Sequence, residues 1–112
     1  MNSHSLLISP ATEKYPEIIV DQLRYKKAAI MVKAINHKLR QQILKFIGDR
    51  GKATVTDIFS HLLLEQSVAS QHLAILRKSG FVKTKRTGKF IYYSLHKAKI
   101  LEFNRIVDMI LA

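Results

Sequence analysis

The sequence has no cysteine, few acidic residues and no long apolar run, and each absence excludes a class of protein. Without cysteine there is no disulfide, no thiolate metal site and no thiol-based redox sensor, so the fold must be held by packing. No apolar run approaches membrane-spanning length, and the amino terminus lacks the basic start of an export signal. We therefore expect a soluble, cytoplasmic protein with no membrane partner.

The sequence also lacks the motifs of an enzyme. It contains no Ser-His-acid order with a supporting turn and no recognisable pair of catalytic carboxylates. The stretch Thr87-Gly88-Lys89 does not have the spacing of a phosphate-binding loop. We therefore expect no catalytic residues and no cofactor.

What the sequence does contain is positive charge, with 19 basic against 8 acidic residues and a formal charge of +11. Such an excess needs an anionic partner or a reason to tolerate self-repulsion. The basic residues form two blocks, Arg24 to Lys52 and Arg77 to Lys89, and residues 53–76 contain no Lys or Arg. A neutral segment between basic blocks differs from a basic tail that coats nucleic acid. A merely solvated basic surface is the alternative.

The length of 112 residues favours a single compact domain. We expect residues 1–15 to be a flexible arm and residues 16–112 to be the domain. Apolar residues at helical spacing after Pro16 predict a long first helix. Asn36 is expected to cap a second helix over residues 37–47, which Gly48 would end.

Two short helices are predicted next. Thr54 and Asp57 have the spacing of a capping box at the start of a third helix, and a turn is expected at residues 63–65. The fourth helix covers residues 66–79, with three apolar residues spaced to pack inward: Ala69, Leu73 and Leu76.

After Gly80 the apolar period changes to two. This alternation predicts strands over residues 82–86 and 89–95 around a turn at Thr87 and Gly88, and residues 97–112 return to helical spacing. The expected fold is mainly α with a small β-hairpin, a winged helix-turn-helix of about five helices and a two-stranded wing.

In a winged helix-turn-helix the second helix of the pair enters the DNA major groove. The first turn and outward face of the predicted fourth helix would present amide, hydroxyl and small apolar groups that can contact base edges: Gln66, Ser67, Val68, Ser70 and Gln71. The alternative is that these are ordinary solvated residues. The cations on either side of this helix favour base recognition. They would supply affinity through phosphate contacts, which carry no sequence information, and the neutral helix between them would contact the bases.

Basic residues at two places are expected to contact the DNA backbone. The hairpin would reach phosphates or the adjacent minor groove through Lys83, Lys85, Arg86 and Lys89. A helix start, where the dipole also favours an anion, would contact phosphates through His37, Lys38 and Arg40.

Four stretches of the chain resemble the ArsR/SmtB family of bacterial winged-helix repressors: Ala34-Ile-Asn-His-Lys-Leu-Arg40, Gln66-Ser-Val-Ala-Ser-Gln-His-Leu73, Leu76-Arg-Lys-Ser-Gly-Phe-Val82 and Tyr92-Tyr-Ser-Leu95. Their joint order is more specific than any single piece. Two residues depart from the family pattern. Lys38 stands where proline is frequent, and Leu63 stands where the inter-helix turn usually has glycine.

The resemblance implies a homodimeric repressor that binds double-stranded DNA. The first and last helices would form the interface, and two recognition helices would read an inverted-repeat operator with half-sites about 34 Å or a multiple apart. Apolar residues on these two helices need cover, from a partner or from the monomer core: Leu23, Ile30, Ile100, Phe103, Val107 and Ile110.

Many members of the resembled family release DNA on binding a metal, but the ligands are missing here. The thiolate site is excluded, and the positions of the last-helix site read Ser94, His96, Val107 and Ile110. One imidazole cannot hold zinc tightly, so His96 is expected to be a cap or a solvated residue, and His72 to make a structural hydrogen bond. We expect no metal. DNA binding would then respond to an organic effector, to a partner protein or to no effector at all.

A second function class stays open. An architectural or RNA-binding protein would use basicity alone and bind any duplex with comparable affinity. A repressor should instead favour its operator by about a thousandfold or more at physiological salt.

Overall fold

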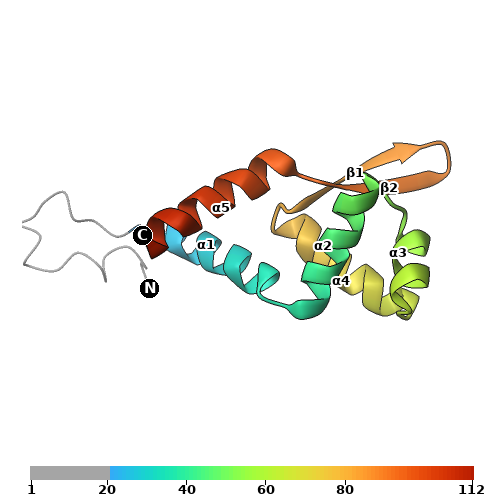
Figure 1. Ribbon diagram of the computed structural model, residues 1–112, viewed down its shortest axis with the longest axis horizontal. Helices are drawn as coiled ribbons and strands as arrows, with labels where there is room; N and C mark the ends of the chain where they lie inside the picture. Colours follow the sequence, from blue (N-terminus) through green and yellow to red (C-terminus); the bar gives the residue numbers. More distant parts are fainter. Residues whose placement is uncertain (1–20) are drawn as a thin grey trace, which may run out of the picture. The chain divides into compact units, whose positions relative to one another are not determined.

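The computed structural model describes residues 21–112, which contain five α-helices and one antiparallel β-hairpin (Figure 1). The predicted arm over residues 1–15 lies outside the described residues. The chain separates into two units, residues 1–33 and residues 34–112. None of the described helices combines the length and the apolar character that crossing a membrane requires.

The first helix is α1, Gln22–Ile35. Asp21 precedes it, and its Oδ1 accepts hydrogen bonds from the backbone amides of Leu23 and Arg24 at 3.0 and 3.3 Å. These bonds satisfy amides that the first turn leaves without a helical partner. Any earlier start of the predicted long helix falls outside the described residues.

The second helix, α2 (Lys38–Arg50), has different ends from those predicted. His37, not Asn36, is the N-cap, because its backbone is extended and its Nδ1 accepts from the Leu39 amide at 3.1 Å. Gly48 lies within the helix. The helix ends at Gly51, which adopts a φ of 86° that favours glycine and donates its amide to Ile47 at 2.8 Å.

The predicted capping box begins α3, Val55–Leu62. The Thr54 hydroxyl accepts from the Asp57 amide at 3.1 Å, and the Asp57 carboxylate accepts from the Thr54 amide at 2.9 Å. This bond from the Thr54 amide is the largest cause that holds the pKa of Asp57 below its usual value. The next helix, α4, covers Gln66–Lys78, within one residue of the prediction.

The turn between α3 and α4 depends on Leu63, the position where the resembled family usually has glycine. Leu63 has φ 56° and ψ 47°, the left-handed helical conformation, and no other non-glycine residue among 21–112 has a positive φ. The Leu64 amide then donates to Phe59 at 2.9 Å, which closes the turn. The turn therefore keeps the geometry that glycine would adopt, at a steric cost.

The hairpin consists of β1 (Val82–Thr87) and β2 (Phe90–Leu95). The strands pair in register from Val82 opposite Leu95 to Thr87 opposite Phe90, so the turn lies at residues 88–89. On the other side of β2, Ala53 forms an isolated antiparallel bridge with Tyr93. The last helix, α5 (Lys97–Leu111), follows the hairpin, and the His96 Nδ1 caps it by accepting from the Lys99 amide at 3.2 Å.

The core of residues 34–112 is formed by side chains from α2, α3, α4 and the residues that lead into β1. Six large side chains in it are fully buried: Ile43, Ile47, Ile58, Leu73, Leu76 and Phe81. Each such burial stabilises the fold by about 1.5–3 kcal/mol relative to an exposed side chain. The predicted inward residues of α4, Ala69, Leu73 and Leu76, are all 0% exposed, which confirms the apolar face of this helix.

Replacing Leu63 with asparagine should raise the free energy of unfolding by about 1 kcal/mol, because asparagine tolerates the left-handed conformation better. Little packing is lost, since Leu63 is 91% exposed. Urea denaturation would show a higher midpoint at unchanged m-value. Leu64→Asn is the matched control and should lower stability, because Leu64 is half-buried. A Leu63→Asn protein less stable than the parent would contradict the strained turn.

Candidate nucleic-acid interface

The outer face of α4 carries all the side chains predicted to contact bases. Val68 is half-buried, and the other four are exposed: Gln66, Ser67, Ser70 and Gln71. By helical spacing Ser67 and Gln71 lie opposite the apolar face that is fully buried in the core, and Gln66 belongs to the first turn. The helix therefore presents neutral amide and hydroxyl groups outward from a fixed base.

The carboxyl end of α4 is held by hydrogen bonds as well as by packing. The Ser79 hydroxyl donates to the Ile75 carbonyl at 2.7 Å, and the Phe81 amide donates to the Leu76 carbonyl at 2.9 Å. Gly80 lies between them with a φ of 89°, a conformation that side chains rarely adopt. The chain thus turns sharply from α4 into β1.

All four cations predicted in the hairpin are exposed: Lys83, Lys85, Arg86 and Lys89. Alternation along β1 puts Lys83 and Lys85 on one face and Arg86 on the other, while Lys89 lies in the turn. Among residues 21–112 none of these four has a carboxylate partner. They are therefore available to an external anion.

At the start of α2 the three residues predicted to contact the DNA backbone differ in exposure. Lys38 is exposed, whereas the His37 ring is half-buried. Arg40 differs from the expectation because it is only 9% exposed and its Nε donates to the Ala34 carbonyl at 2.6 Å. The prediction that Arg40 contacts a phosphate does not fit this position, because its guanidinium bonds to Ala34 and His72 inside the domain.

His72, on α4, makes the structural hydrogen bond that was expected of it. Its Nδ1 lies 3.2 Å from NH1 of Arg40, and its ring centroid lies 4.8 Å from that of His37. A guanidinium only donates, so this Nδ1 accepts and carries no proton. Burial lowers the pKa of His72 below its usual value of 6.5, and the nearby His37 and Arg40 lower it further. The cluster ties α4 to the start of α2.

Two basic residues beside the hairpin were not singled out from the sequence. Arg50 and Lys52 precede Ala53, and the bridge from Ala53 to Tyr93 brings this segment to the edge of β2. The Lys52 Nζ lies 4.7 Å from the centroid of the Tyr92 ring, a cation–π contact. A single bridge between residues forty apart leaves no periodic signal in the sequence.

Metal ligands do not gather in the described part of the chain. Within residues 21–112 no three His, Asp or Glu side chains lie together in a group that could hold an ion. His96 is used as the cap of α5, one of the two roles expected of it.

Comparison with known proteins gives a consistent set of similarities. A family model described as bacterial regulatory protein, arsR family, matches residues 37–84. An uncharacterised HTH-type transcriptional regulator of Methanocaldococcus jannaschii is 34% identical over 85 residues, which cover 76% of this chain and 96% of the relative. The transcriptional activator HlyU of Vibrio cholerae is 36% identical over 74 residues, which cover 66% of this chain and 68% of HlyU.

The solved structures similar to this chain are also regulators of transcription. Reduced HlyU from Vibrio cholerae is 35% identical and matches with a TM-score of 0.60 over 76% of this chain and 93% of that one. The transcriptional repressor PagR of Bacillus anthracis is 29% identical and matches with a TM-score of 0.64 over 78% of this chain and 99% of that one.

The helix pair, the hairpin and these similarities define a winged helix-turn-helix, DNA-binding regulator of transcription. The chain belongs to the arsR family of bacterial regulatory proteins. The predicted fold and family are confirmed. The expectation that the chain is not an enzyme is confirmed too, because the family and its members are regulators.

The His72 cluster predicts a dependence of stability on pH. Because the pKa of His72 is lowered by folding, the unfolded chain takes up this proton first as the pH falls below about 6.5. The contribution of neutral His72 to the free energy of unfolding is therefore fully present above about pH 6.5 and is lost as the pH falls toward the lowered pKa. Urea denaturation between pH 5 and 8 should show this fall, and a His72→Gln variant should show less of it. Equal pH profiles for the two proteins would rule out this contribution of His72.

Proposed function

We propose that the chain is a sequence-specific regulator that binds an inverted-repeat operator as a homodimer, with α4 in the major groove and the hairpin on the backbone. The observation that carries this proposal is the neutral polar face of α4, held on a fully buried apolar face and accompanied by exposed hairpin cations. Residues 16–112 would serve as one DNA-binding and dimerisation domain.

The chemistry of α4 favours sequence recognition over the architectural alternative. A glutamine can pair bidentately with adenine, a serine can bond to any base edge, and a valine methyl can contact the methyl of thymine. No cation occurs on α4 before Arg77, so most of its exposed face offers little to a phosphate. A protein that bound DNA by charge alone would gain nothing from this face.

Repression, rather than activation, remains part of the proposal. The similar proteins include an activator, HlyU, and a repressor, PagR. We infer repression from the resembled family, which consists largely of repressors, and we place the protein in the cytoplasm, where bacterial DNA is found. An effector is not identified by these similarities.

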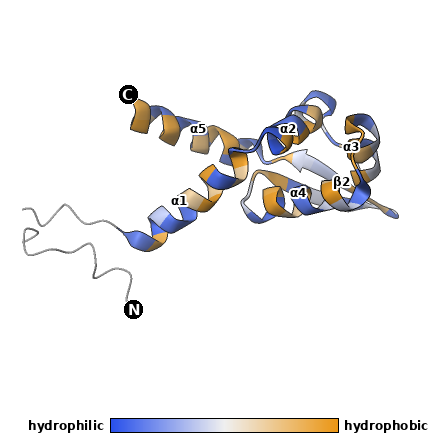
Figure 2. Ribbon diagram, turned by 90° about the horizontal axis from the view of Figure 1, so that it is seen from below, coloured by the Kyte–Doolittle hydropathy of each residue, from blue (hydrophilic) through white to orange (hydrophobic). Residues whose placement is uncertain are grey.

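Exposed apolar residues on α1 and α5 support the homodimer. Leu23 and Ile30 of α1 are 51% and 53% exposed, and Ile110 of α5 is 74% exposed. Ile100, Phe103 and Val107 are half-buried, and the Phe103 ring already meets Phe81 edge-on at 5.4 Å. Figure 2 shows hydrophobic residues along much of α5. Apolar surface of this extent is expected to be covered by a partner.

Gln71→Ala should weaken binding to the operator much more than binding to a random duplex, because only the operator complex uses base edges. The operator is first selected from genomic fragments with the purified protein. A lost bidentate contact is worth about 1–3 kcal/mol, which is about a 5- to 150-fold loss of affinity for the operator. Fluorescence anisotropy with both DNAs measures the two losses.

The matched control is Lys85→Ala, which should weaken binding to both DNAs and lower the salt slope by about one unit, as a lost phosphate contact does. Equal losses on both DNAs for Gln71→Ala would favour the architectural alternative.

Ile110→Asp should convert the dimer into a monomer and reduce operator binding by about tenfold or more, because it places a charge in an apolar interface. The fold of the monomer should survive, since Ile110 is 74% exposed. Analytical ultracentrifugation measures the association. Asn104→Asp adds the same charge to an exposed position on another side of α5 and should leave the dimer intact. A dimeric Ile110→Asp protein would remove α5 from the interface.

A further inference from the structure

One face of the hairpin brings basic residues from two segments around one serine of β2. Lys83 and Ser94 are directly opposite each other, and Lys85 is opposite Tyr92. β2 lies between β1 and the Ala53 bridge, so Lys52 approaches the same face from the other side. We call Lys52, Lys83, Lys85 and Ser94 the Ser94 cradle. Adjacent strands are about 4.8 Å apart, so the cradle spans about 10 Å.

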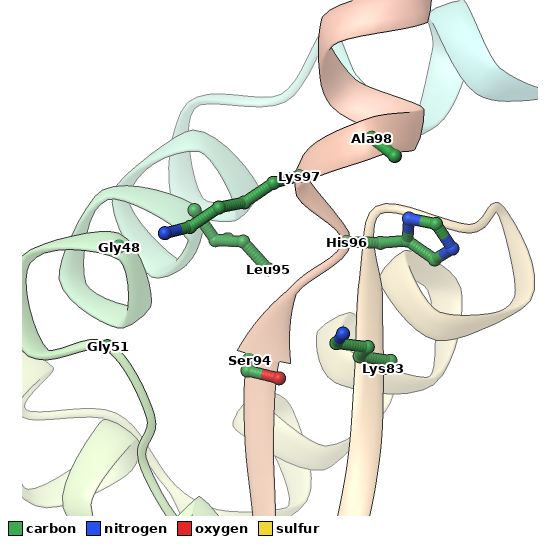
Figure 3. A pocket seen from close by; sticks show the side chains of 8 residues that line it. All are labelled: Gly48, Gly51, Lys83, Ser94, Leu95, His96, Lys97 and Ala98. Atoms are coloured by element: carbon green, nitrogen blue, oxygen red, sulfur yellow. The ribbon is translucent and has the colours of Figure 1, made fainter.

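The face is hollowed on both sides of Ser94. A hollow of about 380 Å³ is lined by Lys52, Lys85, Tyr92 and Ser94 among others. A second, of about 410 Å³, is lined by Lys83, Ser94 and Lys97. Figure 3 shows Ser94 and Lys83 side by side on the two strands, with Lys97 extending from the start of α5. Ser94 lines both hollows.

The charges of the cradle are uncompensated. Elsewhere two cations form ion pairs, Lys45 with Asp49 at 3.1 Å and Arg50 with Asp57 at 3.7 Å. Across residues 21–112 no carboxylate pairs with a cradle lysine, and the Ser94 hydroxyl makes no hydrogen bond. Three like charges on one face without a carboxylate among them repel one another. An oxyanion bound between them would offset this repulsion and accept a bond from the hydroxyl.

We propose that the Ser94 cradle binds a small oxyanion, the carboxylate or phosphate group of an organic ligand, and that this ligand is an effector. The row of Lys83 and Ser94 is the second residue pair from the base of the hairpin, away from the turn at residues 88–89. A ligand there would occupy Lys83 and Lys85, which we assign to DNA phosphates, so it would weaken DNA binding. This last step rests on the proposed function.

Binding to the cradle is tested by NMR titration of the ¹⁵N-labelled full chain with potassium phosphate, with potassium chloride adjusted to keep ionic strength constant. We expect saturable shifts of the amides of Gly51, Lys83 and Ser94. Lys52→Gln and Ser94→Ala should each raise the dissociation constant by about threefold or more, the size of a partly exposed charge or hydrogen-bond contact. Lys45→Gln, the matched control, should leave it unchanged. Linear shifts spread over all exposed lysines, or an unchanged constant in Lys52→Gln, would overturn the proposal.

The effect on DNA is tested with the selected operator at the same constant ionic strength. Phosphate should weaken operator binding by the parent protein and have a smaller effect on Lys52→Gln. Without phosphate, Lys52→Gln should keep the salt slope of the parent. A slope lower by about one unit would assign Lys52 to the DNA backbone and overturn the small-ligand site. Failure of the parent protein to prefer any DNA would count against the proposed function and leave the NMR result standing.

Discussion

The burial of one face of α4 is the constraint on which the binding surface depends. Ala69, Leu73 and Leu76 are fully buried, so the helix cannot rotate about its axis without exposing apolar surface. The same constraint fixes the direction in which Gln66 and Gln71 point. A surface that distinguishes base edges needs this fixed geometry, because a hydrogen bond weakens steeply when its donor is misaligned.

A polar contact adds to this apolar packing near the middle of α4. His72 accepts from Arg40, and Arg40 donates to the carbonyl of Ala34, so α4 is linked to the segment that leads into α2. Removing one member would leave a buried polar group without its partner, which costs more than the bond contributes. The position of α4 therefore depends on a neutral His72 as well as on hydrophobic packing.

The sequence predicted the parts of the fold that repeat and the local capping box of Thr54 and Asp57, but it misplaced one cap and missed two longer-range contacts. Helical and alternating periods located the five helices and two strands of residues 21–112, because each period follows from which side chains are buried. The cap of α2 was misplaced, since Asn36 and His37 can both cap and only the backbone at His37 is extended. Arg40 was assigned to DNA because its bond to a carbonyl six residues away has no sequence signal. Lys52 was not singled out, because the one bridge from Ala53 to Tyr93 that brings it beside Tyr92 leaves no period in the sequence.

Phe81 connects the three parts of the molecule that the proposed function requires. Its amide donates to Leu76 at the end of α4, its carbonyl accepts from the His96 amide at the start of α5 at 2.9 Å, and its ring meets Phe103 of α5. It is 1% exposed and directly precedes β1. The recognition helix, the base of the hairpin and the helix that we propose to dimerise therefore meet at one packed residue. Packed interiors respond to displacement as units, so a ligand at the base of the hairpin would act where all three elements join.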